Sequence, residues 1–439
     1  MEKKKYIVIL IDGAADYRIA ELGDKTPLQA AKKPAIDYLA MHGKLGMVKT
    51  IPDGISPGSD TANLSILGYD PGVYYSGRSS LEAVSMGIKL SDNDITFRCN
   101  LVTLSEEENY SDRLMVDYSA GEITTEESRV LIEDLAKLLD TEEIKFYPGL
   151  SYRHLIVWKG GPDGFELTPP HDISGRRIGK YLPGGKYKDI ILSLMLKSAE
   201  ILKDHPVNKK RISGGNRPAN SIWIWGKGNK PRLDSFYKKY GIEGSVISAV
   251  DLVKGIAICA GLKVVSVEGA TGNIHTNFSG KAKAAINEIK DGKDFVYIHI
   301  EAPDECGHQG NAASKVKAIE IIDEKVVKAI KDSLDEMGEN YKVLILPDHP
   351  TPVSKMTHTS EPVPFLIYES SNEKRSLAEV KSTNKELIAN NEGSTNKWKN
   401  SNEPANNSLP GQTYDEFSAQ ETGLFINTGP ELLDYFLKK

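Results

Sequence analysis

The sequence predicts an α/β protein whose core is a mainly parallel sheet flanked by helices. Three apolar runs, at residues 6–11, 295–300 and 342–346, have the continuous hydrophobic character of strands that are covered on both faces. Helical patterns at residues 249–260 and 314–337 lie between these runs. Such alternation favours crossover βαβ units, which place their strands parallel to one another in one sheet.

Length and composition are ordinary for a soluble globular protein. Its 439 residues are enough for two or three domains, with 39% hydrophobic and 26% charged residues. A formal net charge of -6 gives no basis for binding nucleic acid. No apolar stretch approaches the length of a membrane span, and the N-terminal run lacks a signal-peptide cleavage site. The widely separated Cys99, Cys259 and Cys306 are typical of reduced thiols, so we expect a cytoplasmic protein without nucleic-acid or membrane partners.

The middle of the chain differs in character from the rest. Its predicted strands and helices lie at residues 155–159, 221–225, 126–139 and 189–205. The polar motifs described below fall on both sides of this stretch, so the simplest topology is an inserted domain. We predict an α/β insert at residues 75–245, within a core formed by residues 1–74 and 246–439. The alternative is a single continuous domain.

One stretch of the predicted core, residues 370–411, is rich in Asn, Ser, Lys and Glu. So polar a segment cannot offset the entropy cost of ordering by burying apolar surface, and we expect a mobile surface loop there. Strand and helix character returns at residues 423–426 and 430–437, which can complete the core.

Each predicted core strand leads directly into residues that can bind a metal ion. Asp12 follows the first strand, residues 301–308 follow the second, and Asp348 and His349 follow the third. Ligands of open parallel sheets gather beyond the carboxyl ends of the strands. We therefore expect these side chains to converge despite their separation in sequence.

Asp304, His308 and His358 are predicted to form one mixed oxygen and nitrogen site. Asp304 and His308 lie four residues apart, close enough to reach one ion from either a helix or a tight loop. His358 lies in a loop rich in turn residues, where apolar packing is not expected. The alternative for the Asp304 and His308 pair is a helix-capping aspartate beside a surface histidine.

Asp12, Asp348 and His349 are predicted to form a second site, with the Ser59 oxygen as a further ligand. Ser59 enters a predicted helix, where free backbone N–H groups favour phosphate, and a metal could lower its pKa enough to make it a nucleophile. The alternatives are a strand-end cap for Asp12 and a plain helix cap for Ser59. Taken together, the two sites indicate two-metal phosphoryl transfer. The sequence contains no GxxxxGK[ST] motif, so nucleotide binding has no direct support.

These motifs resemble those of the cofactor-independent phosphoglycerate mutases, in particular the archaeal-type branch within the alkaline phosphatase superfamily. The resemblance covers nearly the whole chain and departs from the family pattern mainly at residues 370–411. The segments that carry it are Asp12, Pro57-Gly-Ser-Asp-Thr-Ala-Asn63, Phe97-Arg-Cys-Asn100, Asp117-Tyr-Ser-Ala-Gly121, Gly269-Ala-Thr-Gly272, Glu301-Ala-Pro-Asp-Glu-Cys-Gly-His308, Pro347-Asp-His349 and His358.

The resemblance implies an alkaline-phosphatase-like core with a lid inserted in it. It also implies interconversion of 3-phosphoglycerate and 2-phosphoglycerate in glycolysis and gluconeogenesis, through a phosphoserine at Ser59. Two divalent ions are implied, with Mn²⁺ as the expected metal and Mg²⁺, Co²⁺ or Zn²⁺ as alternatives, and no 2,3-bisphosphoglycerate. The lid residues implied to bind the substrate's phosphate and carboxylate are Arg153, His154, His171 and Arg217, with Lys254 on the hinge side.

Three other functions stay open on the sequence. The first is a related metal-dependent phosphotransferase such as a homoserine kinase, because fold and metal site alone do not fix the substrate. A phosphomonoesterase is the second, and it would differ in letting water reach the phosphorylated serine. The third is a binding module without catalytic activity.

Overall fold

The computed structural model describes residues 4–370 and 413–438 and divides the chain into two compact units. One unit comprises Met1–Tyr75 and Leu233–Lys439, and the other is Ser76–Arg232. Tyr75 and residues 233–245, placed in the insert by the sequence prediction, therefore group with the first unit. The polar stretch at residues 370–411 lies outside the described residues, apart from Ser370.

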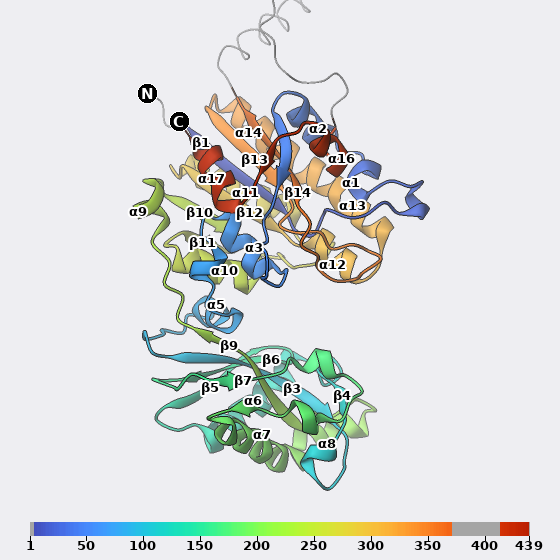
Figure 1. Ribbon diagram of the computed structural model, residues 1–439, viewed down its shortest axis with the longest axis vertical. Coiled ribbons are helices and arrows are strands. Elements are labelled where there is room, and N and C mark those ends of the chain that lie inside the picture. The colour runs from blue at the N-terminus through green and yellow to red at the C-terminus, as the bar shows by residue number, and fades with distance from the viewer. Residues whose placement is uncertain (1–3, 371–412, 439) are drawn as a thin grey trace, which may run out of the picture. The chain divides into compact units, whose positions relative to one another are not determined.

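An eight-stranded sheet forms the centre of the first unit, in the order β11-β10-β12-β1-β13-β14-β2-β15 (Figure 1). Its strands are β1 (Lys5–Ile11), β2 (Lys44–Val48), β10 (Gly244–Ile247), β11 (Lys263–Val265), β12 (Phe295–Ile300), β13 (Tyr341–Leu346), β14 (Val363–Glu369) and β15 (Phe425–Ile426). Among the described strands of this sheet only β14 is reversed, since it pairs antiparallel with both β13 and β2. The mainly parallel sheet predicted from the sequence is therefore confirmed.

Helices cover both faces of this sheet (Figure 1). The described α-helices of this unit are α1 (Pro27–Ala30), α2 (Pro34–Met41), α3 (Ser59–Ile66), α4 (Pro71–Tyr74), α9 (Phe236–Tyr240), α10 (Asp251–Cys259), α11 (Phe278–Lys290), α12 (Ala302–His308), α13 (Ala312–Ile322), α14 (Lys328–Glu336), α16 (Glu416–Glu421) and α17 (Gly429–Leu437). Side chains alternate between the faces along a strand. On β1, Ile7 and Ile9 join a core cluster that includes Ile319 of α13, while the ring of Tyr6 contacts Phe436 of α17.

Lys328–Glu336 continues the helix that begins at Ala312, through a π-helical turn at Asp323–Val327. The wider turn directs the Asp323 carboxylate at the start of α2, where it accepts hydrogen bonds from the backbone N–H groups of Ala35 and Ile36. One carboxylate therefore satisfies two of the donors that a helix N-terminus leaves unpaired.

The second unit is built on an antiparallel sheet in which β3 pairs with β4, β6 and β9, and β5 pairs with β6. Its strands are β3 (Ile95–Leu104), β4 (Met115–Asp117), β5 (Ile144–Leu150), β6 (Arg153–Trp158), β9 (Ser221–Asn229), and a separate pair formed by β7 (Phe165–Glu166) and β8 (Gly184–Gly185). Its helices are α5 (Arg78–Ser85), α6 (Thr125–Leu139), α7 (Lys188–Lys203) and α8 (Pro206–Ser213). This unit has its own hydrophobic core, in which Phe97 and Trp223 of the sheet pack with Leu131 of α6 and Met195 of α7.

The described helices do not meet the requirements of a membrane span. None of those within residues 4–370 and 413–438 is both long enough and apolar enough to cross a bilayer.

The Glu416 carboxylate at the start of α16 predicts a pH-dependent contribution to stability. It accepts hydrogen bonds from the Asp16 N–H and the Thr26 hydroxyl, and burial raises its pKa from 4.5 to about 7. Because the folded state then holds the proton more tightly, this contribution is full below about pH 4.5 and is lost as the pH rises to about 7. Between these two pH values, the free energy of unfolding of a Glu416→Gln variant should therefore fall less than that of the wild type, by up to about 3 kcal/mol.

Urea unfolding of chelator-treated protein at pH 5 and pH 8 measures this contribution. Glu421→Gln, an exposed change on the same helix, is the matched control and should keep the wild-type pH dependence. An unchanged difference between the two pH values in Glu416→Gln would contradict the assignment.

Candidate active site

The carboxyl ends of three adjacent strands, β12, β1 and β13, bring the predicted metal ligands of the first unit together. Asp12 follows β1, and Asp348 and His349 follow β13. The His349 Nε2 atom lies 3.3 Å from Asp348 Oδ2 and 3.8 Å from Asp12 Oδ1. All three side chains are at most 1% exposed, so their charges and lone pairs are shielded from water.

Gly13 allows this close approach. Its φ is +62°, and a Cβ at this position would lie 2.5 Å from Asp304 Oδ1, where no side chain fits. The Gly13 N–H donates to Asp348 Oδ1 at 3.1 Å. A glycine directly after Asp12 therefore lets the loop after β1 contact both Asp304 and Asp348.

Ser59 is the first residue of α3 and faces the same cluster. Its Oγ lies 3.0 Å from His349 Nε2, within hydrogen-bonding distance. One turn later in α3, the Asn63 amide donates to Asp348 Oδ2 at 3.1 Å and to the Ser59 carbonyl oxygen at 2.9 Å. The Tyr297 hydroxyl donates to Asn63 Oδ1 and fixes the orientation of that amide. Helix α3 thus positions the hydroxyl beside the ligands that follow β13.

The other predicted ligands, Asp304, His308 and His358, also come together. His308 Nε2 lies 3.2 Å from one Asp304 carboxylate oxygen, and His358 Nε2 lies 3.5 Å from the other. The two Nε2 atoms are 2.9 Å apart. The His358 ring also stacks on that of His349, with ring centroids 4.0 Å apart, so the two predicted sites adjoin one another.

His299 is a further member of the cluster that the sequence prediction missed. It lies on β12, is fully buried, and its Nε2 is 2.9 Å from Asp12 Oδ2. Asp12 Oδ1 and His299 Nε2 have no hydrogen-bond partner within the part of the chain that the structure describes. A titratable side chain inside the otherwise apolar run at residues 295–300 was the signal in the sequence that could have identified His299.

The protonation states follow from burial and from neighbouring charges. Burial, followed by the charges of Asp348 and Asp304, raises the pKa of Asp12 well above its usual range. Burial opposes ionisation of Asp304, but its hydrogen bonds with His308 and His358 hold its pKa well below the usual range. The hydrogen bond to Asp304 raises the pKa of His308 to about 9. Burial lowers the pKa of His349, which favours the neutral imidazole that can bind a cation.

The donors fit divalent cations. Three sets of side chains offer ligand atoms within 4.8 Å of one another, namely Asp304 with His349 and His358, Asp12 with His299 and Asp348, and Asp12 with Glu301 and Asp304. Buried carboxylates repel one another unless a cation or a proton neutralises them, and the unpartnered Asp12 oxygen is one such acceptor. Mixed carboxylate and imidazole donors suit Mn²⁺, Zn²⁺ and Co²⁺.

Three of the substrate-binding candidates lie around Asp117 and Tyr118 in the second unit. Arg217 forms an ion pair with Asp117 at 2.6 Å, and the His171 ring makes an edge contact with that of Tyr118. The Arg153 guanidinium lies over the ring of Tyr152, which in turn contacts Tyr118. Arg153, His171 and Arg217 are all exposed, so their cationic or polar groups are accessible to an anion.

His154 and Lys254 lie in different surroundings. His154 is 2% exposed on β6, where its Nδ1 accepts a hydrogen bond from the Gly149 N–H. Burial lowers the pKa of this histidine to about 3, so it is neutral and enclosed rather than available to a substrate anion. Lys254 lies on α10 in the first unit and donates to Asp251 at 3.2 Å.

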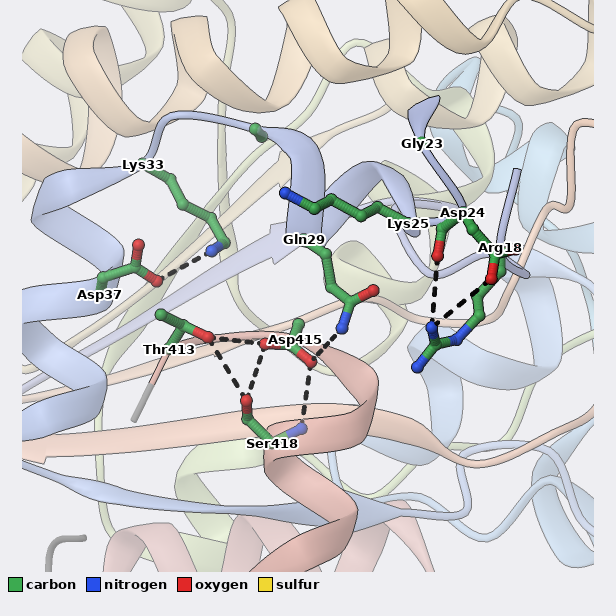
Figure 2. Close-up of a pocket in the computed structure, with 11 residues that line it drawn as sticks. Arg18, Gly23, Asp24, Lys25, Gln29, Lys33, Asp37, Thr413, Asp415 and Ser418 are labelled. Atoms are coloured by element: carbon green, nitrogen blue, oxygen red, sulfur yellow. Dashed lines mark hydrogen bonds and ion pairs between the residues drawn. The ribbon is translucent and has the colours of Figure 1, made fainter. Parts of the chain in front are cut away.

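A separate surface pocket of about 500 Å³ in the first unit contains none of the predicted site residues. Its lining charges are largely paired, as Figure 2 shows for Lys33 with Asp37 and for Arg18 with Asp24. The Asp415 carboxylate accepts hydrogen bonds from Gln29, Thr413 and Ser418. The pocket therefore has no strong preference for a ligand of either charge.

Known proteins similar in sequence to this chain identify its family. The sequence model of the family described as 2,3-bisphosphoglycerate-independent phosphoglycerate mutase matches residues 40–208. A protein of that description from Methanosarcina barkeri is 53% identical over 367 residues, which cover 83% of this chain and 90% of the relative. The chain belongs to the 2,3-bisphosphoglycerate-independent phosphoglycerate mutase family.

Two solved structures resemble this chain, and one of them is a phosphoglycerate mutase. The cofactor-independent phosphoglycerate mutase of Thermoplasma acidophilum is 28% identical, with a TM-score of 0.56 over 83% of this chain and 89% of its own. A Pyrococcus horikoshii protein of solved structure is also 28% identical, with a TM-score of 0.76 over 100% of this chain and 97% of its own. As a member of the phosphoglycerate mutase family, the chain is an isomerase, as predicted from the sequence.

Proposed function

We propose that this mutase interconverts 3-phosphoglycerate and 2-phosphoglycerate through a phosphoserine at Ser59, with two divalent ions beside it. The observation that carries the proposal is the position of the Ser59 Oγ, 3.0 Å from His349 Nε2 at the edge of a buried cluster of carboxylates and imidazoles. A hydroxyl among such donors is suited to become a nucleophile. A serine that only caps a helix needs contacts with backbone N–H groups and none with these side chains.

The proposed ligands of one ion are Asp304, His308 and His358. The other ion would be held by Asp12, Ser59, Asp348 and His349, with His299 as an additional donor near Asp12. When bound, the ions would act as Lewis acids, lower the pKa of the serine hydroxyl and offset the charge of the transferring phosphoryl group. The expected metal is Mn²⁺, and Mg²⁺, Co²⁺ or Zn²⁺ are the alternatives.

Ser59 takes part directly in both steps of the phosphoryl transfer. Ser59 Oγ forms a bond to phosphorus as the bond from phosphorus to the 3-oxygen of glycerate breaks, and the proton lost by Ser59 is balanced by the one that this oxygen gains. The 2-hydroxyl of glycerate then attacks the phosphoserine, the bond from phosphorus to Ser59 Oγ breaks, and the proton lost by the 2-hydroxyl is balanced by the one that Ser59 regains. The position of Ser59 at the start of α3 directs free backbone N–H groups towards the transferred phosphoryl group.

A mutase must hold glycerate between the two transfers and keep water from the phosphoserine. We assign binding of the substrate's anionic groups to Arg153, His171 and Arg217 of the second unit and to Lys254 of the first. His154 is omitted because its ring is enclosed. Interconversion of the two phosphoglycerates is a step of glycolysis and gluconeogenesis, which we propose as the role of the enzyme.

The test is turnover of 3-phosphoglycerate by chelator-treated protein to which Mn²⁺ is restored, with no 2,3-bisphosphoglycerate present. We expect 2-phosphoglycerate to form only with metal and without release of inorganic phosphate. Phosphate release without 2-phosphoglycerate would instead indicate a phosphomonoesterase. Turnover of homoserine with ATP, in place of 3-phosphoglycerate, would indicate a phosphotransferase of the homoserine kinase type.

A further inference from the structure

Lys315 of α13 is a fully buried cation that the proposed reaction does not use. Its side chain is 0% exposed, and its ammonium group donates to three oxygens: Asp16 Oδ2 at 2.7 Å, the Thr351 carbonyl at 2.8 Å and the Ala15 carbonyl at 3.2 Å. All three of its N–H bonds are therefore satisfied. Burying a lysine is costly unless its ammonium group is fully paired. This complete set of acceptors therefore indicates that the ammonium group has a defined position.

The acceptors of Lys315 belong to the two loops that carry metal ligands. Ala15 and Asp16 follow Asp12 in the loop after β1, and Thr351 follows His349 in the loop after β13. The Asp16 carboxylate also accepts a hydrogen bond from the Val353 N–H at 3.1 Å. One ammonium group thus ties together two loops that are far apart in sequence.

Thr351 extends this connection to the ligands themselves. Its hydroxyl donates to Asp304 Oδ1 at 2.5 Å and lies 3.3 Å from His349 Nδ1, on the ring edge opposite the Nε2 that faces Ser59. Its carbonyl approaches Gly307 so closely that a Cβ there would lie 2.4 Å away. Thr351 is fully buried and therefore held on all sides.

We propose that Lys315 and Thr351 are positioning residues of the metal centre. Lys315 fixes the spacing of the loops after β1 and β13, and Thr351 passes that spacing on to the Asp304 carboxylate and the His349 ring. This inference rests on the proposed two-ion function. Partners behind metal ligands set the orientation of those ligands, and their loss weakens metal binding by roughly 10- to 100-fold. A buried ion pair that acted only on stability would leave metal affinity unchanged.

Two test variants and two controls separate positioning from stability. Thr351→Val removes the hydroxyl and keeps the carbonyl that accepts from Lys315, whereas Thr351→Ser keeps the hydroxyl. The double variant Lys315→Met with Asp16→Asn removes the cation without leaving an unpaired buried carboxylate. The matched control is Lys33→Met with Asp37→Asn, since Lys33 is 3% exposed and pairs with Asp37 at 2.8 Å away from the proposed ligands.

The measurement is calorimetric titration of chelator-treated full-length protein with Mn²⁺, together with thermal unfolding. We expect Thr351→Val and the Lys315 double variant to bind Mn²⁺ roughly 10- to 100-fold more weakly, while Thr351→Ser and the Lys33 control bind it as the wild type does. Raising the Mn²⁺ concentration should restore the activity of both weakened variants, with an unchanged KM for 3-phosphoglycerate.

Wild-type Mn²⁺ affinity in Thr351→Val and in a folded Lys315 double variant would overturn the inference and leave the proposed function intact. If the double variant does not fold, the affinity of Thr351→Val decides the question by itself. A wild-type protein that binds none of Mn²⁺, Mg²⁺, Co²⁺ and Zn²⁺ would overturn the proposed function, and the positioning roles with it.

Discussion

Replacement of Ser59 by alanine is expected to lower kcat for conversion of 3-phosphoglycerate by ~10⁴-fold or more, because the covalent acceptor of the phosphoryl group is lost. The same change should leave the fold intact, since Ser59 Oγ has only one hydrogen-bonding neighbour among the described side chains, His349 Nε2. Steady-state turnover in the presence of Mn²⁺ measures the effect. Mass spectrometry of acid-quenched wild-type protein should find one phosphoryl group on the peptide that contains Ser59.

Ser56→Ala is the matched control for this prediction. Ser56 is an exposed serine of the loop that leads into α3, and only its backbone carbonyl is used, as an acceptor for the Thr61 hydroxyl. The control should keep wild-type turnover, and its peptide that contains Ser59 should still carry one phosphoryl group. Retention of more than about a tenth of wild-type turnover by Ser59→Ala would rule out the proposed covalent step.

Most of the candidate site could be predicted from the sequence because a general rule says where the residues that follow parallel strands lie. Buried parallel strands are continuous apolar runs, and whatever follows them lies at one edge of the sheet. That rule places Asp12, Asp348 and His349 together without any knowledge of the intervening residues. The helical patterns were equally legible, and residues 126–139 correspond closely to α6 (Thr125–Leu139).

Side chains that act through other side chains could not be predicted in this way. Lys315 lies inside a helix, where no local pattern distinguishes it from an ordinary surface lysine. His299 lies inside a strand, and its one signal was a titratable side chain in an apolar run. Thr351 is recognisable only once its 2.5 Å contact with Asp304, 47 residues away in sequence, is known. Pairing direction is likewise set by tertiary contacts, so the antiparallel sheet of the second unit was not specified by its short strand patterns.

The same dependence on tertiary contacts explains the difference at the end of the predicted insert. The segment after β9 contains α9 (Phe236–Tyr240), whose Phe236 ring packs on Phe295 of β12 with centroids 4.7 Å apart. Composition does not change sharply there, because residues 230–243 are polar and rich in lysine like the insert before them. The boundary depends on which hydrophobic core Phe236 packs into. Its contact with Phe295 joins residues that are 59 positions apart in sequence.

Asp12→Asn should separate catalytic function from stability of the metal-free protein. The Asp12 carboxylate is 1% exposed, lies in one cluster with Asp304 and Glu301, and has an oxygen without a hydrogen-bond partner among the described residues. Without a cation, such a carboxylate is repelled by its neighbours, so a neutral amide of the same shape should stabilise the metal-free protein by roughly 1–2 kcal/mol. With Mn²⁺ present, loss of an anionic ligand should lower turnover by roughly 10³-fold, equivalent to about 4 kcal/mol.

Opposite signs for the two effects are the decisive feature of Asp12→Asn. Urea unfolding in a chelating buffer measures the first effect, and turnover with saturating Mn²⁺ measures the second. Asp53→Asn, which changes an exposed aspartate of the same unit, should alter neither. A strand-end cap would behave differently, because its loss would destabilise the metal-free protein and leave turnover of the folded fraction intact. A metal-free Asp12→Asn protein that is less stable than wild type and fully active with Mn²⁺ would therefore show that Asp12 caps β1 and binds no ion.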